Sequence, residues 1–110
     1  MYIKKMIEFL TMGKKAKEEK FTLMGEFEKK RADLLKKHHS EKDALCIAEL
    51  EEILSNGFSE ELVKKYLLKK VDLCEKHQQE EEQMWKEAHD KCAEVHARNK
   101  KNREEFKKSL

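Results

Sequence analysis

Five histidines and three cysteines are the residues of this chain that could bind a transition metal or act as nucleophiles. His89, Cys92 and His96 fall at positions i, i+3 and i+7, a spacing that places all three side chains on one face of a helix. Zinc and copper accept imidazole and thiolate ligands, and a fourth ligand would have to come from elsewhere. The spacing predicts one candidate metal site on a helix surface.

A second candidate depends on how the chain folds back on itself. If a turn near Gly57 pairs residues whose numbers sum to about 115, His38 lies opposite His77, with Glu41 and Cys74 one turn away on their own helices. These four side chains are acceptable zinc ligands inside a helical bundle.

The same histidines have two simpler interpretations. A histidine between helices is often just hydrogen-bonded, and cysteine packs as a small apolar residue. Two facing rings could also make the bundle respond to pH, because both gain charge near their ordinary pKa of about 6.5. Since the chain has no Cys-x-x-Cys pair, we expect neither a metal nor another cofactor.

Motifs of catalysis are missing from the sequence. It contains no phosphate-binding glycine loop, nucleophile elbow, zinc-protease helix motif or Rossmann turn. A cysteine and a histidine on neighbouring helices would still need an oxyanion site, which no motif supplies. We expect a protein that is not an enzyme and has no catalytic residues.

The elements that position these side chains are predicted to be helices. The chain has no proline, only three glycines and 44% charged residues, and its apolar residues recur every three or four positions. Asn56-Gly57 can end one helix in the left-handed conformation, and Ser59 can cap the next. The prediction is an all-α antiparallel helical hairpin, a coiled coil. It forms a single domain of residues 1–110, with arm one at about 2–54, the turn at 55–59 and arm two at about 60–108.

Arm one has two further places where the helix could break. Gly13 lies in a stretch with few apolar residues, and Ser40 follows cations and precedes acids, as at a helix start. Breaks there would give three or four shorter helices. We favour the continuous arm because no proline enforces either break.

Both arms carry apolar stripes with the spacing of a coiled-coil seam. The residues expected to form this self-association or partner seam are Phe27, Leu34, Leu45, Ile53, Tyr66, Cys74, Trp85, Cys92, Val95 and Phe106. Trp85 is expected to pack in the core near Ala32, the alternative being an exposed anchor in a binding surface.

Further apolar residues make these stripes wider than a two-helix hairpin needs. They are Tyr2, Met6, Phe9, Leu23, Leu50, Leu62, Leu67, Leu68, Leu73 and Met84, whereas Ile3, Ile7, Leu10, Phe21 and Met24 belong to the expected seam of arm one. The extra surface could be covered by a second copy, completing an antiparallel four-helix bundle, or by a different protein. Either way we expect a protein–protein interaction module of the adaptor, chaperone or inhibitor type, with a protein partner and a homodimer as its assemblies.

The charges are balanced overall, at +2, but unevenly distributed. Residues 1–20 and 91–110 carry net charges of +3 and +4, whereas 41–61 carries −6, so the open end of a hairpin would be basic and the turn acidic. The basic end comprises Lys14, Lys15, Lys17, Arg98, Lys100, Lys101 and Arg103. It could orient dimers, or it could contact nucleic acid phosphates, which makes a nucleic-acid-associated helical protein an alternative.

Location can be argued only from what the sequence lacks. No run approaches the ~18 apolar residues of a membrane span, and the first ten residues have no small-residue cleavage site. An odd number of cysteines without turn-rich loops argues against a disulfide framework. We expect a protein without membrane contact in a reducing compartment, either the cytoplasm or the cytoplasm of a host cell.

Overall fold

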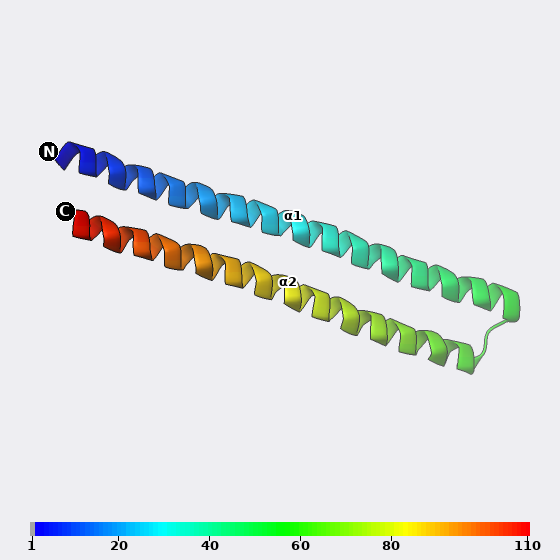
Figure 1. Cartoon of the computed structure of the whole chain (residues 1–110). Coiled ribbons are helices and arrows are strands. Elements are labelled where there is room, and N and C mark those ends of the chain that lie inside the picture. The colour runs from blue at the N-terminus through cyan, green and yellow to red at the C-terminus, as the bar shows by residue number, and fades with distance from the viewer. Residues whose placement is uncertain (1) are drawn as a thin grey trace. The chain divides into compact units, whose positions relative to one another are not determined.

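The computed structural model describes residues 2–110, which fold into two long helices joined by a short turn (Figure 1). α1 spans Tyr2–Asn56 and α2 spans Glu60–Ser109. Residues 2–110 contain no strand. The predicted all-α helical hairpin is confirmed, whereas dimerisation stays a prediction.

The turn is built by the residues that the sequence singles out. Gly57 has φ +80°, a left-handed conformation that glycine adopts without strain, and its N–H donates to the Ile53 carbonyl at 2.9 Å. Ser59 Oγ accepts from the Leu62 N–H at 3.2 Å and caps α2, whose first turn carries Glu60 and Glu61. These contacts end α1 and start α2 within three residues.

α1 continues without interruption through Gly13 and Ser40. An ion pair between Lys37 Nζ and Glu41 Oε1 at 3.8 Å spans Ser40, and His39 Nε2 lies 3.3 Å from Asp43 Oδ2 in the next turn. Such i,i+4 pairs support the helix, and no proline opposes it. Neither of the two possible breaks occurs.

The helices pack in two compact units. Unit 1 comprises Met1–Lys29 with Trp85–Leu110, and unit 2 comprises Lys30–Met84. Within each unit a segment of α1 lies beside an antiparallel segment of α2 (Figure 1).

Little of the chain is fully buried. In residues 2–110 the buried side chains are Tyr66, His38 and His77 in unit 2 and Val95 in unit 1. Two of these four are histidines, so the interior of unit 2 contains polar groups that must find partners. No helix in the same range is long and apolar enough to cross a membrane.

Candidate functional site

His38 and His77 form the buried centre of unit 2. Their rings stack with centroids 3.7 Å apart and planes inclined by 15°. His38 Nε2 lies 3.3 Å from Glu80 Oε2, and His77 Nε2 lies 3.3 Å from Glu41 Oε2. His38 Nδ1 also has a carboxylate nearby, Glu81 Oε1 at 3.7 Å, whereas His77 Nδ1 is buried with no hydrogen-bond partner. A proton on Nε2 lets the His77 ring donate to Glu41 Oε2.

Two lysines close the cluster from both helices. Lys37 Nζ lies 3.5 Å from Glu80 Oε2 and 3.8 Å from Glu41 Oε1. Lys76 Nζ lies 3.4 Å from Glu41 Oε2 and 3.8 Å from Glu80 Oε1. Each lysine therefore contacts both carboxylates. We call the six residues the histidine clasp: Lys37, His38, Glu41, Lys76, His77 and Glu80.

A repeated motif underlies the clasp. Residues 33–41 and 72–80 both read D-L-x-x-K-H-x-x-E, once in α1 and once in α2. Two antiparallel helices with the same motif at their crossing are related by a local two-fold axis, so each histidine meets the glutamate of the other helix. The sequence argument found the facing histidines but missed this repeat, which is the signal that identifies the lysines and Glu80.

Electrostatics keep both clasp carboxylates charged. The hydrogen bond with His77 holds the pKa of Glu41 below its usual value. Partial burial raises this pKa, and the positive charges of Lys76 and Lys37 lower it further. The hydrogen bond with His38 lowers the pKa of Glu80 in the same way, again with help from the two lysines. The clasp is therefore a set of charge-assisted contacts at neutral pH.

The metal site predicted between the two helices is only partly assembled. His38, His77 and Glu41 come together, but their rings stack face to face and Cys74 is exposed on α2. Residues 2–110 contain no group of three or more His, Cys, Asp or Glu side chains placed to hold a metal ion.

The metal site predicted on a single helix face lies on the surface of α2. His89, Cys92 and His96 are all exposed, and His89 Nδ1 has Asp90 Oδ1 at 3.9 Å. Their shared helical face is as the spacing predicts, but it converges on no common centre.

The predicted basic end falls entirely within unit 1. All seven of its residues are exposed, and Arg98 pairs with Glu19 across the two helices. Unit 1 holds 15 Lys and Arg against 10 Asp and Glu, a net +5, whereas unit 2 holds 10 against 13, a net −3. The units thus have opposite charge.

Most predicted seam residues lie where the helices meet. Tyr66 and Val95 are buried, and the half-buried ones are Phe27, Leu34, Leu45, Ile53 and Phe106.

Three residues expected on the seam of α2 are placed differently. Cys74, Trp85 and Cys92 are exposed, and the half-buried positions include Lys70, Leu73 and Met84 instead. Between Lys70 and Met84 the seam is displaced by one residue, or about 100° around the helix. Lys70 can occupy it because its aliphatic stem packs while its Nζ reaches Glu49 Oε2 at 2.6 Å. Trp85 stays 55% exposed and packs against Phe27, with ring centroids 4.8 Å apart, not against Ala32.

The first turns of α1 expose an apolar surface, the N-terminal patch, formed by Ile3, Ile7 and Leu10. These side chains are 71%, 58% and 67% exposed. Each of these residues stands two positions before a residue that faces α2, which is Lys5, Phe9 or Met12. Two residues turn an α-helix by about 200°, so the side chains of the N-terminal patch point away from the seam. Ile3, Ile7 and Leu10, expected on the seam of arm one, therefore lie behind α1.

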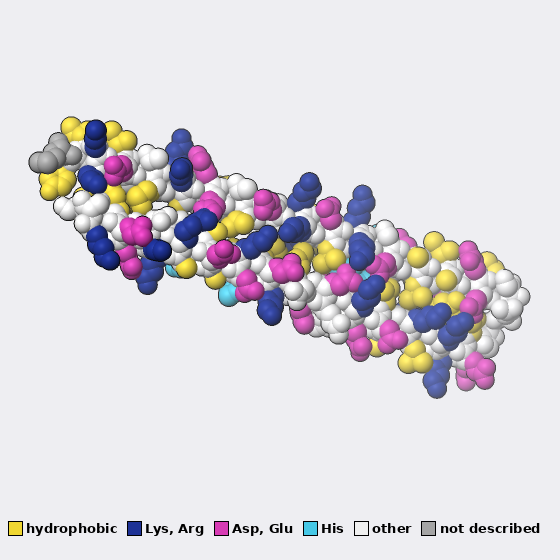
Figure 2. All heavy atoms as spheres, in the orientation of Figure 1, with side chains coloured by type: hydrophobic (Ala, Val, Ile, Leu, Met, Phe, Trp, Pro, Cys, Tyr) yellow, Lys and Arg dark blue, Asp and Glu magenta, His cyan; other side chains and the backbone are white. Residues whose placement is uncertain are grey.

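The end of α1 exposes a second surface, the turn patch, formed by Ile47, Leu50 and Leu54. These side chains are 55%, 59% and 85% exposed, and each follows by two residues a half-buried position of unit 2. The turn patch also faces away from α2. Figure 2 shows apolar side chains at the surface near both ends of α1.

Comparison with known proteins identifies no relative: no family model, no curated protein and no solved structure matches the chain.

Proposed function

We propose that this protein is a protein-binding helical module that acts through the apolar surfaces its own hairpin leaves uncovered. The observation that carries the proposal is the imbalance of its apolar side chains. In residues 2–110, 18 large hydrophobic side chains are exposed and only Tyr66 and Val95 are buried. Exposed apolar residues in contiguous rows are typical of interaction surfaces.

The rows on α2 add a candidate surface to the two patches of α1. In unit 2, Leu67, Val71 and Cys74 follow one another at helical spacing, and in unit 1, Trp85 and Cys92 are exposed on α2. Tryptophan is enriched among residues that dominate binding energy. A helix of a partner protein laid along such a face would bury these side chains at i, i+3, i+4 and i+7.

The other features fit this role. The clasp fixes which faces of α1 and α2 pair in unit 2, so the remaining faces of that unit have a defined position. Three exposed free thiols favour a reducing compartment such as the cytoplasm. The basic end would steer the module toward acidic surfaces, and no second feature in the described residues points specifically to nucleic acid.

Site-specific photo-crosslinking in cells tests the proposal. A benzophenone amino acid replaces Trp85 in one variant and the exposed polar residue Lys64 in a control. We expect discrete protein adducts from position 85 that the control lacks. Equal adduct patterns from both positions, or no adduct from position 85, would refute a binding surface on α2.

A further inference from the structure

The N-terminal patch is the first part of a longer stripe on the back of α1. After its last residue, Leu10, the alternating spacing of four and three residues continues through Lys14, Lys17, Phe21 and Met24. Phe21 and Met24 are 78% and 60% exposed, and both lysines are exposed. We call the patch and these four residues the outer seam, because this spacing is that of a coiled-coil seam. All of it lies in unit 1.

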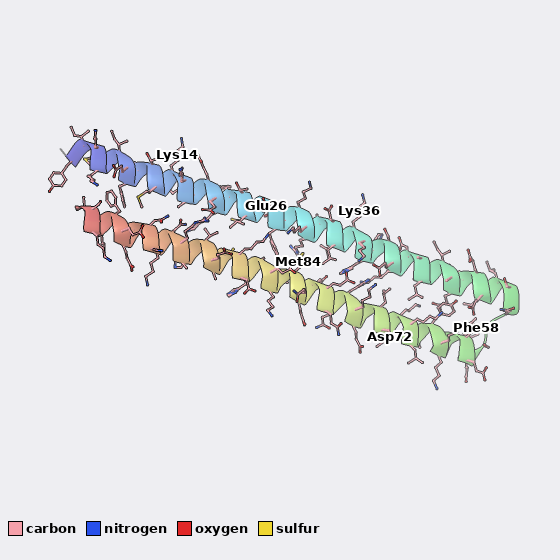
Figure 3. All side chains as sticks on the ribbon, viewed as in Figure 1. Lys14, Glu26, Lys36, Phe58, Asp72 and Met84 are labelled. Atoms are coloured by element: carbon pink, nitrogen blue, oxygen red, sulfur yellow. The ribbon has the colours of Figure 1, made fainter. Side chains whose placement is uncertain are left out.

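The outer seam faces away from α2 along its whole length. Lys14 and Lys17 stand two positions before Ala16 and Glu19, which are half-buried, and Glu19 pairs with Arg98 of α2. Two residues turn a helix by about 200°, so both lysines point outward, as Figure 3 shows for Lys14. In residues 2–110 neither lysine has an acidic partner. Both charges are therefore available to a group from outside the chain.

We propose that the outer seam binds one helix of another protein as a coiled coil, and that this partner helix carries acidic residues opposite Lys14 and Lys17 and apolar residues on either side. This inference rests on the proposed function and states the chemistry of one partner. A lysine within a seam costs stability unless the facing residue compensates its charge, so it selects for the partner. From Ile3 to Met24 the contact spans three heptads, about 32 Å of helix.

The two lysines also decide between the possible occupants of this face. A parallel second copy would place Lys14 on Lys14 and Lys17 on Lys17. An antiparallel copy would place the lysines on each other or on apolar residues of the seam, and both arrangements bury charge without compensation. A lipid surface would cover an apolar helix face, but it requires no heptad spacing. Spacing and charge together favour an acidic helix of a different protein.

Two synthetic peptides of three heptads test the inference on the purified full chain. Both have leucine at the outer a and d positions, and the two positions that face Lys14 and Lys17 are glutamate in one peptide and lysine in the other. Each is made in a parallel and an antiparallel version. Fluorescence anisotropy should show that a glutamate peptide binds at least about 10-fold more tightly than its lysine counterpart, because like charges facing each other oppose binding.

Charge-reversal variants identify the residues responsible. Lys14→Glu combined with Lys17→Glu should reverse the preference, so that the lysine peptide binds more tightly. Lys15→Glu combined with Lys101→Glu is the matched control, because it changes the charge of unit 1 equally at exposed positions outside the outer seam. This control should keep the preference for glutamate, and circular dichroism should show both variants as helical as the wild type.

The inference is overturned if neither peptide binds, if both bind equally, or if the preference survives Lys14→Glu with Lys17→Glu. Self-association to twice the mass of 13.2 kDa that is lost in Ile7→Lys would assign the face to a second copy instead. Anionic phospholipid vesicles bound without any bound peptide would assign it to a lipid surface. If the peptides fail while position 85 still gives protein adducts, the proposed function holds and only the acidic helix is excluded.

Discussion

The two units hold α1 and α2 together by different means. Unit 2 has the histidine clasp and further cross-helix ion pairs, Lys65 to Glu52 at 2.9 Å and Lys70 to Glu49 at 2.6 Å. Unit 1 has Val95 and two aromatic contacts, of which Phe9 and Phe106 have ring centroids 5.8 Å apart. Unit 2 therefore has more polar contacts across the helices than unit 1, where the ion pair of Arg98 with Glu19 accompanies the apolar and aromatic contacts.

This difference matters for register. Hydrogen bonds and ion pairs require particular atoms to face each other, whereas a thin apolar seam accepts several alignments with similar burial. Exposed ion pairs contribute only about 0–1 kcal/mol each, so the polar contacts of unit 2 act on alignment more than on stability. We expect unit 2 to specify how the hairpin closes.

The largest expected effect is at the most buried side chain. Tyr66 is 2% exposed and has Lys65 Nζ and Lys69 Nζ within 5.4 Å of its ring centroid. Tyr66→Ala should lower the free energy of unfolding by about 3 kcal/mol, because it leaves a cavity in the small interior of unit 2. Urea denaturation followed by circular dichroism measures this. Phe58→Ala, in the exposed turn, should change it by no more than about 0.5 kcal/mol, and equal losses would contradict this account.

A paired substitution compares the two units directly. His77→Ala should cost about 2 kcal/mol, because it removes the stacking partner of His38 and the donor to Glu41. Val95→Ala in unit 1 should cost about 1 kcal/mol through lost apolar burial. Amide hydrogen exchange should show faster exchange in unit 2 for His77→Ala and faster exchange in unit 1 for Val95→Ala. If both variants loosen the same residues, the units do not behave separately.

Glycine substitutions should act in opposite directions. Gly57→Ala should cost about 1 kcal/mol, since alanine is strained at φ +80°. Gly25→Ala is the counterpart, because Gly25 lies inside α1 and an added Cβ meets no atom within 4 Å. It should stabilise the hairpin by about 0.5–1 kcal/mol. Thermal melts of the two variants should shift in opposite directions.

Acid should have the smallest effect, and it should begin in unit 2. Glu41 and Glu80 have pKa values below 4.5 in the folded chain. Their charged forms therefore stabilise the fold above pH 4.5, and this contribution is lost as pH falls through their lowered pKa values. Carbon-detected NMR titration of the side-chain carboxyls should give midpoints below 4.5 for both. In His77→Gln the pKa of Glu41 should rise toward 4.5, and an unchanged midpoint would remove His77 as the cause.

The turn and the helix bounds were predictable because local chemistry determines them. Asn56-Gly57 and Ser59 have strong conformational preferences, so the predicted arms differ from the observed helices by at most two residues. The facing of His38 and His77 followed from the turn position alone.

The choice between adjacent stripes was not predictable in the same way. On α2 the stripe through Leu73 and Met84 and the stripe through Cys74 and Trp85 have similar spacing and lie about 100° apart. Apolar content favours the second, but the structure uses the first, where Lys70 packs with its stem and pairs with Glu49. Periodicity shows that a stripe exists, and only the partner helix shows which stripe is used.

The repeat of D-L-x-x-K-H-x-x-E has a consequence for synthesis of the chain. The first copy of the motif leaves the ribosome 39 residues before the second. During that interval Lys37, His38 and Glu41 of α1 have no partners from α2. Because the motif complements itself when antiparallel, the nearest available match during that interval is the same segment on a neighbouring nascent chain. The spacing of ribosomes on the message would then influence whether the first pairing occurs within one molecule or between two.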